Sequence, residues 1–347
     1  MFLQMLVSMS KKRNIIILSA VVLAAAVGLI SIFFSDIRLF SKDKESFTFT
    51  AAGDYGYNTN TDRVLNKIGE IGPDFHLTTG DMNYMKVGDE EEWCAYVKER
   101  VGADLPFELL SGNHESDGQN GLIDNFVKCL PNKIEGVSGE YGKQYFFDYP
   151  SEDPFARFIL ISPTLKFQSG ERYDYSPGSK RFGWLQSAVE GAKQKRMSWV
   201  IVVSHKDCFS PGRNDCVVGS ELMNYLISNV DIILQSHSHI YARSKPLKCV
   251  VAGSRGMVWD ENCVAKNELE SVMKKGNGAI AFSVGTGGQS VREVDTNSEI
   301  VNYLAKYMGS NVSPSFGVLK FEVARDQIRG EYVSAVGSFF DSFVINN

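Results

Sequence analysis

Short apolar runs alternate with stretches of helical periodicity along most of this chain. Such alternation is typical of strands joined by crossover helices, as in α/β proteins. We expect strands at 47–52, 75–79, 107–110, 158–162, 199–204 and 231–234, and helices at 62–71, 90–101, 122–130, 181–195 and 221–228. The last third reads mostly as strands, at 249–252, 279–284, 317–323 and 328–335. These patterns predict an α/β fold in which two mixed β-sheets pack as a sandwich flanked by helices.

Polar residues that can bind metals follow five of the expected strands. They lie in the segments Gly53-Asp54-Tyr55-Gly56, Gly80-Asp81-Met82-Asn83-Tyr84, Gly112-Asn113-His114-Glu115, Ser204-His205 and Ser236-His237-Ser238-His239. Because the carboxyl ends of parallel strands share one edge of a sheet, we expect these side chains to converge although they are far apart in sequence. The glycines before Asp54, Asp81 and Asn113 would let the chain turn sharply away from each strand.

The residue types in these segments favour a site for two metal ions. Carboxylates, an amide, imidazoles and a phenol suit iron, zinc or manganese, and the set is too rich in nitrogen for calcium or magnesium. Each motif alone has an ordinary explanation, because Gly-Asp is common in turns and a lone histidine is usually structural. However, four of the five histidines fall in these segments. We therefore interpret the segments as one metal site and the fifth histidine, His76, as structural.

This ordered set of residues resembles the calcineurin-like metallophosphoesterase superfamily. The resemblance is carried by Asp54, Asp81, Asn113, His205 and the pair His237 and His239. The first motif reads Asp-x-Gly and Tyr84 stands three residues after Asp81, as in the purple acid phosphatase branch. Further similarity comes from Trp184-Leu185, residues 199–206, Tyr241, Arg243, Gly285-Thr286-Gly287-Gly288, Phe316-Gly317-Val318-Leu319 and Asp341-Ser342. The chain departs from the branch at Ser236, which replaces a usual glycine, and at Ala242, where a glutamate commonly sits.

The resemblance implies a four-layer αββα fold and an enzyme that hydrolyses phosphate esters by attack of a hydroxide bridging two metals. The first metal would be held by Asp54, Asp81, Tyr84 and His239, and the second by Asp81, Asn113, His205 and His237, with Asp81 shared. A phenolate at Tyr84 favours Fe³⁺ at the first position, and Fe²⁺, Zn²⁺ or Mn²⁺ is expected at the second. His114 would give a proton to the leaving oxygen, and Glu115 would orient a neighbouring group.

The expected substrate is a small phosphorylated molecule, and no residue of the sequence identifies its leaving group. Two alternatives to a phosphatase stay open. The protein could be a phosphodiesterase or nucleotide pyrophosphatase, or a surface protein that keeps the metals and binds a partner without catalysis. The complete ligand set together with His114 favours an enzyme, because a binding protein has no need of an acid beside the metals.

The N-terminal part of the sequence predicts a membrane anchor. Residues 15–34 form an apolar stretch of 20 residues without charge, which is long enough for a helix that spans a bilayer. A basic triplet at 11–13 precedes it, so the positive-inside rule leaves the N-terminus in the cytoplasm and the rest of the chain outside. We expect a cytoplasmic segment at 1–13, an anchor at 14–35, a stalk at 36–45 and a catalytic domain at 46–347. A cleaved signal peptide, which would give a secreted protein, is the alternative.

Cysteine usage and charge agree with an extracytoplasmic domain. All six cysteines lie beyond the apolar stretch, and Cys208 with Cys216 or Cys249 with Cys263 would close short loops if disulfides form. The sequence does not choose among the possible pairings. Acidic residues outnumber basic ones by 41 to 36, so no broad positive surface is expected to hold a nucleic acid. The sequence does not identify protein partners, which stay unknown.

Overall fold

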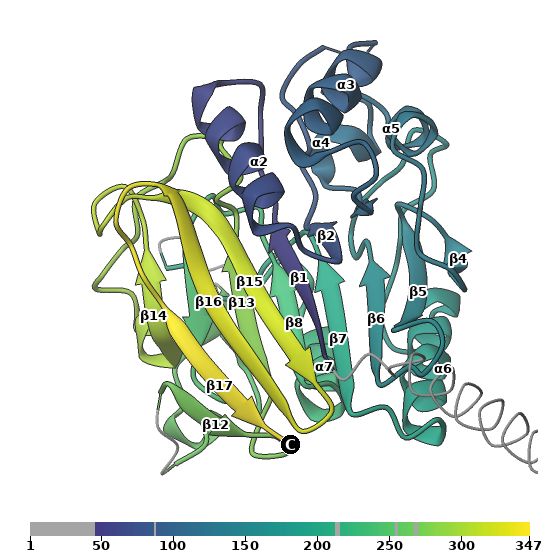
Figure 1. Ribbon diagram of the computed structural model, residues 1–347. Helices are drawn as coiled ribbons and strands as arrows, with labels where there is room; N and C mark the ends of the chain where they lie inside the picture. The colour runs from purple at the N-terminus through teal and green to yellow at the C-terminus, as the bar shows by residue number, and fades with distance from the viewer. Residues whose placement is uncertain (1–45, 87, 212–215, 254–255, 267–269) are drawn as a thin grey trace, which may run out of the picture. The chain divides into compact units, whose positions relative to one another are not determined.

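Two β-sheets that pack face to face form the centre of this protein (Figure 1). The computed structural model describes residues 46–347 except 87, 212–215, 254–255 and 267–269, and Ser46–Asn347 is one compact unit. The expected cytoplasmic segment, anchor and stalk lie outside the described residues. Within the described part, no helix combines the length and the apolar character that a bilayer span needs.

The first sheet has seven strands in the order β12-β17-β16-β15-β1-β2-β3. Strands β1, β2 and β3 are parallel, and β15 pairs with β1 in the antiparallel direction. The bounds are β1 Ser46–Ala52, β2 Phe75–Thr78, β3 Phe107–Glu108, β12 Val272–Lys274, β15 Phe316–Ala324, β16 Gln327–Val336 and β17 Ser342–Asn346.

The second sheet has eight strands in the order β14-β9-β13-β8-β7-β6-β5-β4, with β6, β7, β8 and β13 parallel. Its bounds are β4 Ser138–Glu140, β5 Gln144–Tyr149, β6 Ala156–Ile161, β7 Trp199–Ser204, β8 Ile232–Gln235, β9 Tyr241–Ser244, β13 Ile280–Val284 and β14 Leu304–Met308. A separate hairpin pairs β10 (Val251–Gly253) with β11 (Gly256–Val258).

Helices cover the outer faces of the sandwich. They are α2 Thr59–Ile71, α3 Glu90–Val101, α4 Asn113–Ser116, α5 Ile123–Cys129, α6 Lys180–Gln194 and α7 Ser220–Asn229, with 3-10 turns at Glu261–Cys263 and Glu299–Tyr303. Helix α2 lies against β15 and β16 of the first sheet, and α6 lies against β6 of the second. Helix α2 begins where the Asn58 side chain accepts the N–H groups of Asn60 and Thr61, and it ends at Gly72 in the left-handed conformation.

Phenylalanine rings fill the space between the two sheets. Phe158 of β6 lies 5.1 Å from Phe49 of β1 and 5.2 Å from Phe75 of β2, measured between ring centroids. Farther along, Phe282 of β13 lies 5.8 Å from Phe321 of β15. All five side chains are buried, and burial of each contributes about 1.5–3 kcal/mol to stability. The apolar runs of the sequence therefore fix the spacing and relative position of the sheets.

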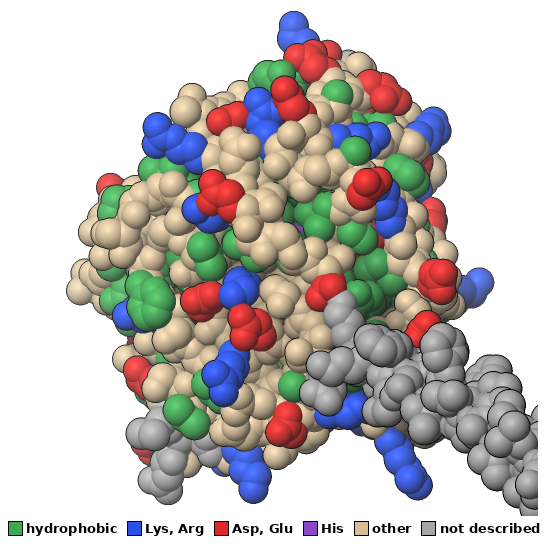
Figure 2. All heavy atoms as spheres, in the orientation of Figure 1, with side chains coloured by type: hydrophobic (Ala, Val, Ile, Leu, Met, Phe, Trp, Pro, Cys, Tyr) green, Lys and Arg blue, Asp and Glu red, His purple; other side chains and the backbone are tan. Residues whose placement is uncertain are grey.

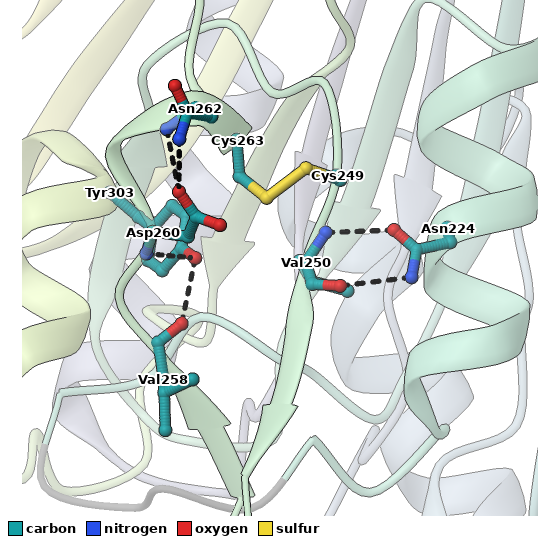
Figure 3. Close-up of a disulfide and its surroundings, with 8 residues drawn as sticks. All are labelled: Asn224, Cys249, Val250, Val258, Asp260, Asn262, Cys263 and Tyr303. Atoms are coloured by element: carbon teal, nitrogen blue, oxygen red, sulfur yellow. Dashed lines mark hydrogen bonds between the residues drawn. A yellow bond between two sulfur atoms is a disulfide. The ribbon is translucent and has the colours of Figure 1, made fainter.

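Three disulfides connect loops and helices of this unit. They join Cys94 to Cys129, Cys208 to Cys216 and Cys249 to Cys263, so both short loops considered from the sequence are closed. Near the third disulfide, Asn224 of α7 exchanges two hydrogen bonds with the backbone of Val250 (Figure 3). The side chains on the face in Figure 2 mix acidic and basic groups without a broad field of either sign.

The expected α/β sandwich is confirmed, and most of the expected strands and helices differ by one or two residues at their ends. The helix at 90–101 and the strand at 199–204 have the predicted bounds. The strands that were not expected from the sequence are β4, β5, β9, β11, β12, β14 and β17. Their runs are short or interrupted by polar residues, and they become strands because a neighbouring strand supplies hydrogen bonds.

Glu108, at the end of β3, gives the fold a testable dependence on pH. Its side chain is buried, Oε1 accepts the Lys133 N–H (3.1 Å), and burial raises the pKa of Glu108 to about 7. The folded protein therefore binds this proton more tightly than the unfolded chain, and stability falls as pH rises from about 4.5 to 7.

We expect Glu108→Gln to remove this loss while keeping an acceptor for Lys133. Relative to the wild type, the variant should gain about 2–3 kcal/mol in free energy of unfolding between about pH 5 and pH 8. Denaturant unfolding of both proteins in chelator measures the difference, with Glu152→Gln on the exposed surface as the control. If the free energy of unfolding depended on pH equally in all three proteins, the pKa of Glu108 would not be raised in the folded state.

Candidate metal centre

The metal-binding residues expected from the sequence lie at the carboxyl ends of strands from both sheets. Asp54 follows β1, Asp81 follows β2, Asn113 begins α4 after β3, His205 follows β7, and His237 and His239 follow β8. Backbone hydrogen bonds join the sheets at this edge, since Gly53 N–H donates to Val284 O (3.0 Å) and Gly287 N–H donates to Gly53 O (2.8 Å). The site therefore belongs to the junction of the two sheets.

The turns at this edge are made mainly by the expected metal ligands themselves. Positive φ angles occur at Asp54 (59°), Asp81 (53°), His237 (72°) and His239 (49°). Of the three glycines expected to make the turns, only Gly80 has a positive φ (97°). Gly112 is needed for close packing instead, because a Cβ there would lie 2.1 Å from Asp81 Oδ1. Such unusual backbone conformations persist where the surrounding structure holds them.

The first group of donor atoms surrounds the hydroxyl of Tyr84. This oxygen lies 2.9 Å from His239 Nε2, 3.2 Å from Asp54 Oδ1 and 3.3 Å from Asp81 Oδ2. His239 Nε2 also lies 3.3 Å from Asp54 Oδ1. Ligands bound at about 2.0–2.2 Å to one cation are themselves about 3 Å apart, so these four side chains fit a single metal ion.

A second group shares Asp81 with the first. His205 Nε2 lies 3.2 Å from Asp81 Oδ2 and 3.1 Å from Asn113 Oδ1. Donor atoms of Asp81, His205 and His237 lie within 4.8 Å of one another. The other oxygen of Asp81, Oδ1, accepts the N–H of His114 (3.0 Å). Oδ2 of Asp81 is thus the atom that faces both groups, as a ligand bridging two cations would.

Backbone carbonyls orient two of the histidines. Nδ1 of His205 donates to Thr79 O (2.9 Å), and Nδ1 of His239 donates to Ser290 O (3.1 Å), so Nε2 of each ring presents its lone pair to the site. Ser236, the residue that replaces a usual glycine, has its hydroxyl 3.0 Å from His205 Nδ1 and donates to Thr79 O (2.7 Å). Ser236 thus helps to position His205, a role that the sequence did not indicate.

Neighbouring side chains shift the pKa values of the acidic groups of the site. Burial acts to raise the pKa of Asp54 and Asp81, but the imidazoles of His239 and His205 outweigh it and hold both pKa values below their usual range. Burial and these two carboxylates raise the pKa of Tyr84. Without a metal, the Tyr84 phenol therefore keeps its proton, and a cation of high charge is required for it to bind as a phenolate.

His114 lies beside the two donor groups. Its Nε2 is 3.7 Å from Asp81 Oδ2, and its ring centroid is 4.2 Å from that of Tyr84. Its Nδ1 donates to Asn120 Oδ1 (2.6 Å), and the amide of Asn120 is oriented because its Nδ2 donates to Met85 O (2.7 Å). Nε2 of His114 is thereby turned toward the site. Asn120 was missed in the sequence because nothing in its loop signals this contact.

Glu115 and His76 lie away from the donor groups. Oε1 of Glu115 accepts the N–H groups of Asp81 (3.0 Å) and Gly112 (2.6 Å), so its carboxyl holds the turn that presents Asp81. Burial, together with the charge of Asp81, raises the pKa of Glu115 to about 8. The ring of His76 contacts the hydroxyls of Thr50 (2.8 Å) and Tyr55 (2.5 Å) in the core.

Lys206 enters the second donor group, which the sequence did not predict. Its Nζ donates to Asn113 Oδ1 (2.6 Å) and lies 3.0 Å from Nε2 and 3.2 Å from Nδ1 of His237. The ammonium is a cation beside two of the donors expected to hold the second metal. The donor atoms of Asn113 and His237 therefore have a positively charged neighbour.

Comparisons with known proteins agree with this geometry. Residues 32–241 match the family model described as calcineurin-like phosphoesterase. Purple acid phosphatase 18 of Arabidopsis thaliana is 25% identical over 205 residues, which cover 57% of this chain and 45% of that protein. A nucleotide pyrophosphatase/phosphodiesterase of Hordeum vulgare is 23% identical over 261 residues, covering 70% and 64%. The solved structure of purple acid phosphatase PPD1 from yellow lupin (Lupinus luteus) seeds superposes with a TM-score of 0.64 at 18% identity, over 87% of this chain and 54% of that one.

These comparisons differ in what they show. The chain spans less than two thirds of the length of both curated relatives, and the structural likeness shows the fold. The matched region, by contrast, covers more than half of the chain and contains every residue of the two donor groups. The resemblance to purple acid phosphatases inferred from the sequence is confirmed. The chain belongs to the calcineurin-like phosphoesterase family, and purple acid phosphatases are among its relatives.

Proposed function

We propose that this protein is a membrane-anchored, extracytoplasmic enzyme that hydrolyses phosphate esters with two metal ions. The observation that carries the proposal is the position of Asp81 Oδ2, which faces Tyr84 on one side and His205 on the other. When bound, the two cations supply a water activated for attack and positive charge for the oxygens of the reacting phosphate. The chain contributes the shared carboxylate and the fixed Nε2 atoms of His205 and His239.

The donor chemistry supports different metals at the two positions. Asp54, Asp81 and Tyr84 offer three anionic oxygens to the first, which favours Fe³⁺. Asn113, His205 and His237 give the second position more neutral donors, which suits Fe²⁺, Zn²⁺ or Mn²⁺. The phenol of Tyr84 ionises only beside a strong positive charge, because burial and the nearby carboxylates raise its pKa.

His114 is the group proposed to move a proton to the departing oxygen. Asn120 accepts from Nδ1 and leaves Nε2 directed toward the site, 3.7 Å from Asp81 Oδ2. A phosphate ester bound at the donor groups would place its leaving oxygen near this nitrogen. The proposed substrate class is small phosphorylated molecules, with no preference fixed among their leaving groups.

Cleavage of diesters or nucleotide pyrophosphates is the second candidate. It is supported by the relative from Hordeum vulgare, whose name describes a nucleotide pyrophosphatase/phosphodiesterase. Activity of the full-length protein on an aryl monoester, an aryl diester and a nucleotide pyrophosphate separates the two candidates. Two bound metals without hydrolysis of any of these would favour a non-catalytic binding protein.

The shared role of Asp81 predicts a difference between two variants. Asp81→Ala should lose both metals because it removes the donor common to both groups, whereas Asn113→Ala should lose mainly the second. Metal content of the purified proteins, measured by mass spectrometry, tests this. If Asp81→Ala retained two metals per chain and full activity, Asp81 would not be the bridging ligand.

The proposed acid predicts an effect that depends on the leaving group. His114→Asn should keep both metals and slow hydrolysis of an alkyl phosphate by about 10²–10⁴-fold, since an alkoxide needs a proton to depart. Nitrophenyl phosphate should be slowed much less, because nitrophenolate leaves without that proton. Rates on both substrates and the metal content are measured together. Equal slowing of both substrates would mean that His114 positions the substrate and is not an acid.

The location proposed for the catalytic domain rests on the apolar stretch 15–34 and on the three disulfides, which persist in oxidising compartments. Protease added to intact cells should digest the protein and leave only the short basic N-terminus protected. An N-terminal epitope detects that fragment, and permeabilised cells serve as the control. Protection of the whole chain in intact cells would place the catalytic domain in the cytoplasm.

A further inference from the structure

The ammonium of Lys206 contacts two of the side chains proposed to bind the second metal. Asn113 Oδ1 accepts from Lys206 Nζ at 2.6 Å and lies 3.1 Å from His205 Nε2. An amide oxygen has two lone pairs, and one of them is directed at Lys206. A metal bound to the other lone pair, between Asn113 and His205, would lie close to this ammonium.

His237 has the same neighbour. Nζ of Lys206 lies nearly as close to Nδ1 (3.2 Å) as to Nε2 (3.0 Å), so it approaches the ring and not one lone pair. Asn113 and His237 are two of the four donors proposed for the second metal. The positive charge of Lys206 is therefore centred on this half of the site.

The backbone of Lys206 is fixed while its side chain is long. The residue directly follows His205, and its carbonyl accepts Gln235 Nε2 (2.7 Å). Two residues later, Cys208 is tied to Cys216 by a disulfide. The amine can leave by rotation of its four-carbon stem, without any change in the backbone that presents His205.

We propose that Lys206 is an internal cation that competes with the second metal ion for Asn113 and His237, so that the two metals bind with unequal affinity. This inference rests on the proposed function, because it requires the two donor groups to be metal sites. The first metal binds to Asp54, Tyr84, His239 and Asp81 directly. The second binds to donors beside the ammonium, whose like charge opposes binding until the side chain moves away.

Metal binding by the stripped full-length protein tests the competition. Zn²⁺ is titrated calorimetrically into the wild type, Lys206→Met and Lys206→Arg, and the stoichiometry is checked by mass spectrometry. Lys206→Met keeps the length of the side chain without its charge, so the dissociation constant of the second Zn²⁺ should fall at least about tenfold. Lys206→Arg keeps the charge, and its second Zn²⁺ should bind no tighter than in the wild type.

Two controls separate the possible outcomes. Lys195→Met removes an exposed lysine paired with Asp148 and should leave both dissociation constants unchanged. The affinity of the first Zn²⁺, whose ligands come from other loops, reports whether each variant is folded. The competition would be overturned if Lys206→Met bound the second Zn²⁺ with unchanged or lower affinity. It would also be overturned if the affinity rose equally in Lys206→Arg. Absence of Zn²⁺ binding by the wild type would instead overturn the proposed function.

Discussion

The packing of one sheet on the other is the constraint on which the site depends. Asp54, Asp81 and Asn113 come from the first sheet, and His205, His237 and His239 come from the second. Neither sheet alone holds a complete set of donors. The rings of Phe49, Phe158 and Phe282 set the separation of the sheets, and a shift there would move the histidines away from the carboxylates. The hydrophobic core therefore determines the geometry of the polar edge.

Hydrogen bonds at the edge turn this packing into a fixed arrangement of donor atoms. His237 N–H donates to Asp54 Oδ2 (2.9 Å), which ties a residue of the second sheet to one of the first. Away from the site, Arg243 of β9 pairs with Asp341 before β17 through both carboxylate oxygens (2.7 and 2.9 Å). The Tyr241 hydroxyl donates to the same carboxylate (2.7 Å). These buried bonds cross between the sheets and oppose sliding of one on the other.

The strands and donor residues that were predicted correctly are those that a local sequence pattern determines. The strand at 199–204 is a continuous apolar run, and a parallel strand buried on both faces requires such a run. The donors were found because each follows a strand of this kind. The ends of strands and the pairing partners of strands were harder to predict, since β17 becomes a strand through its pairing with β16 and β12. The positive φ angles of Asp54 and His237 were also missed, because side-chain contacts and not local propensity hold them there.

Contacts that depend on where a side chain points could not be predicted from the sequence. Lys206 is adjacent to His205 in the chain, yet adjacency does not say on which side of a turn a long side chain will lie. Its entry into the second donor group depends on the bond from Gln235 to its carbonyl and on the contacts of Nζ with Asn113 and His237. Asn120 likewise contacts His114 in a loop held by two further bonds, from its N–H to His114 O and from its Nδ2 to Met85 O (both 2.7 Å).

Internal charge compensation explains how such a site can exist before metals bind. Buried carboxylates without partners would cost several kcal/mol each, but Asp54 faces His239 at 3.3 Å and Asp81 faces His205 at 3.2 Å. Burial lowers the pKa of His205, yet the charge of Asp81 outweighs burial and raises the pKa to about 9. Lys206 gives the neutral donors of the second group a positive neighbour as well. Under the proposed function, metals would enter a site whose donor atoms these contacts already hold in place.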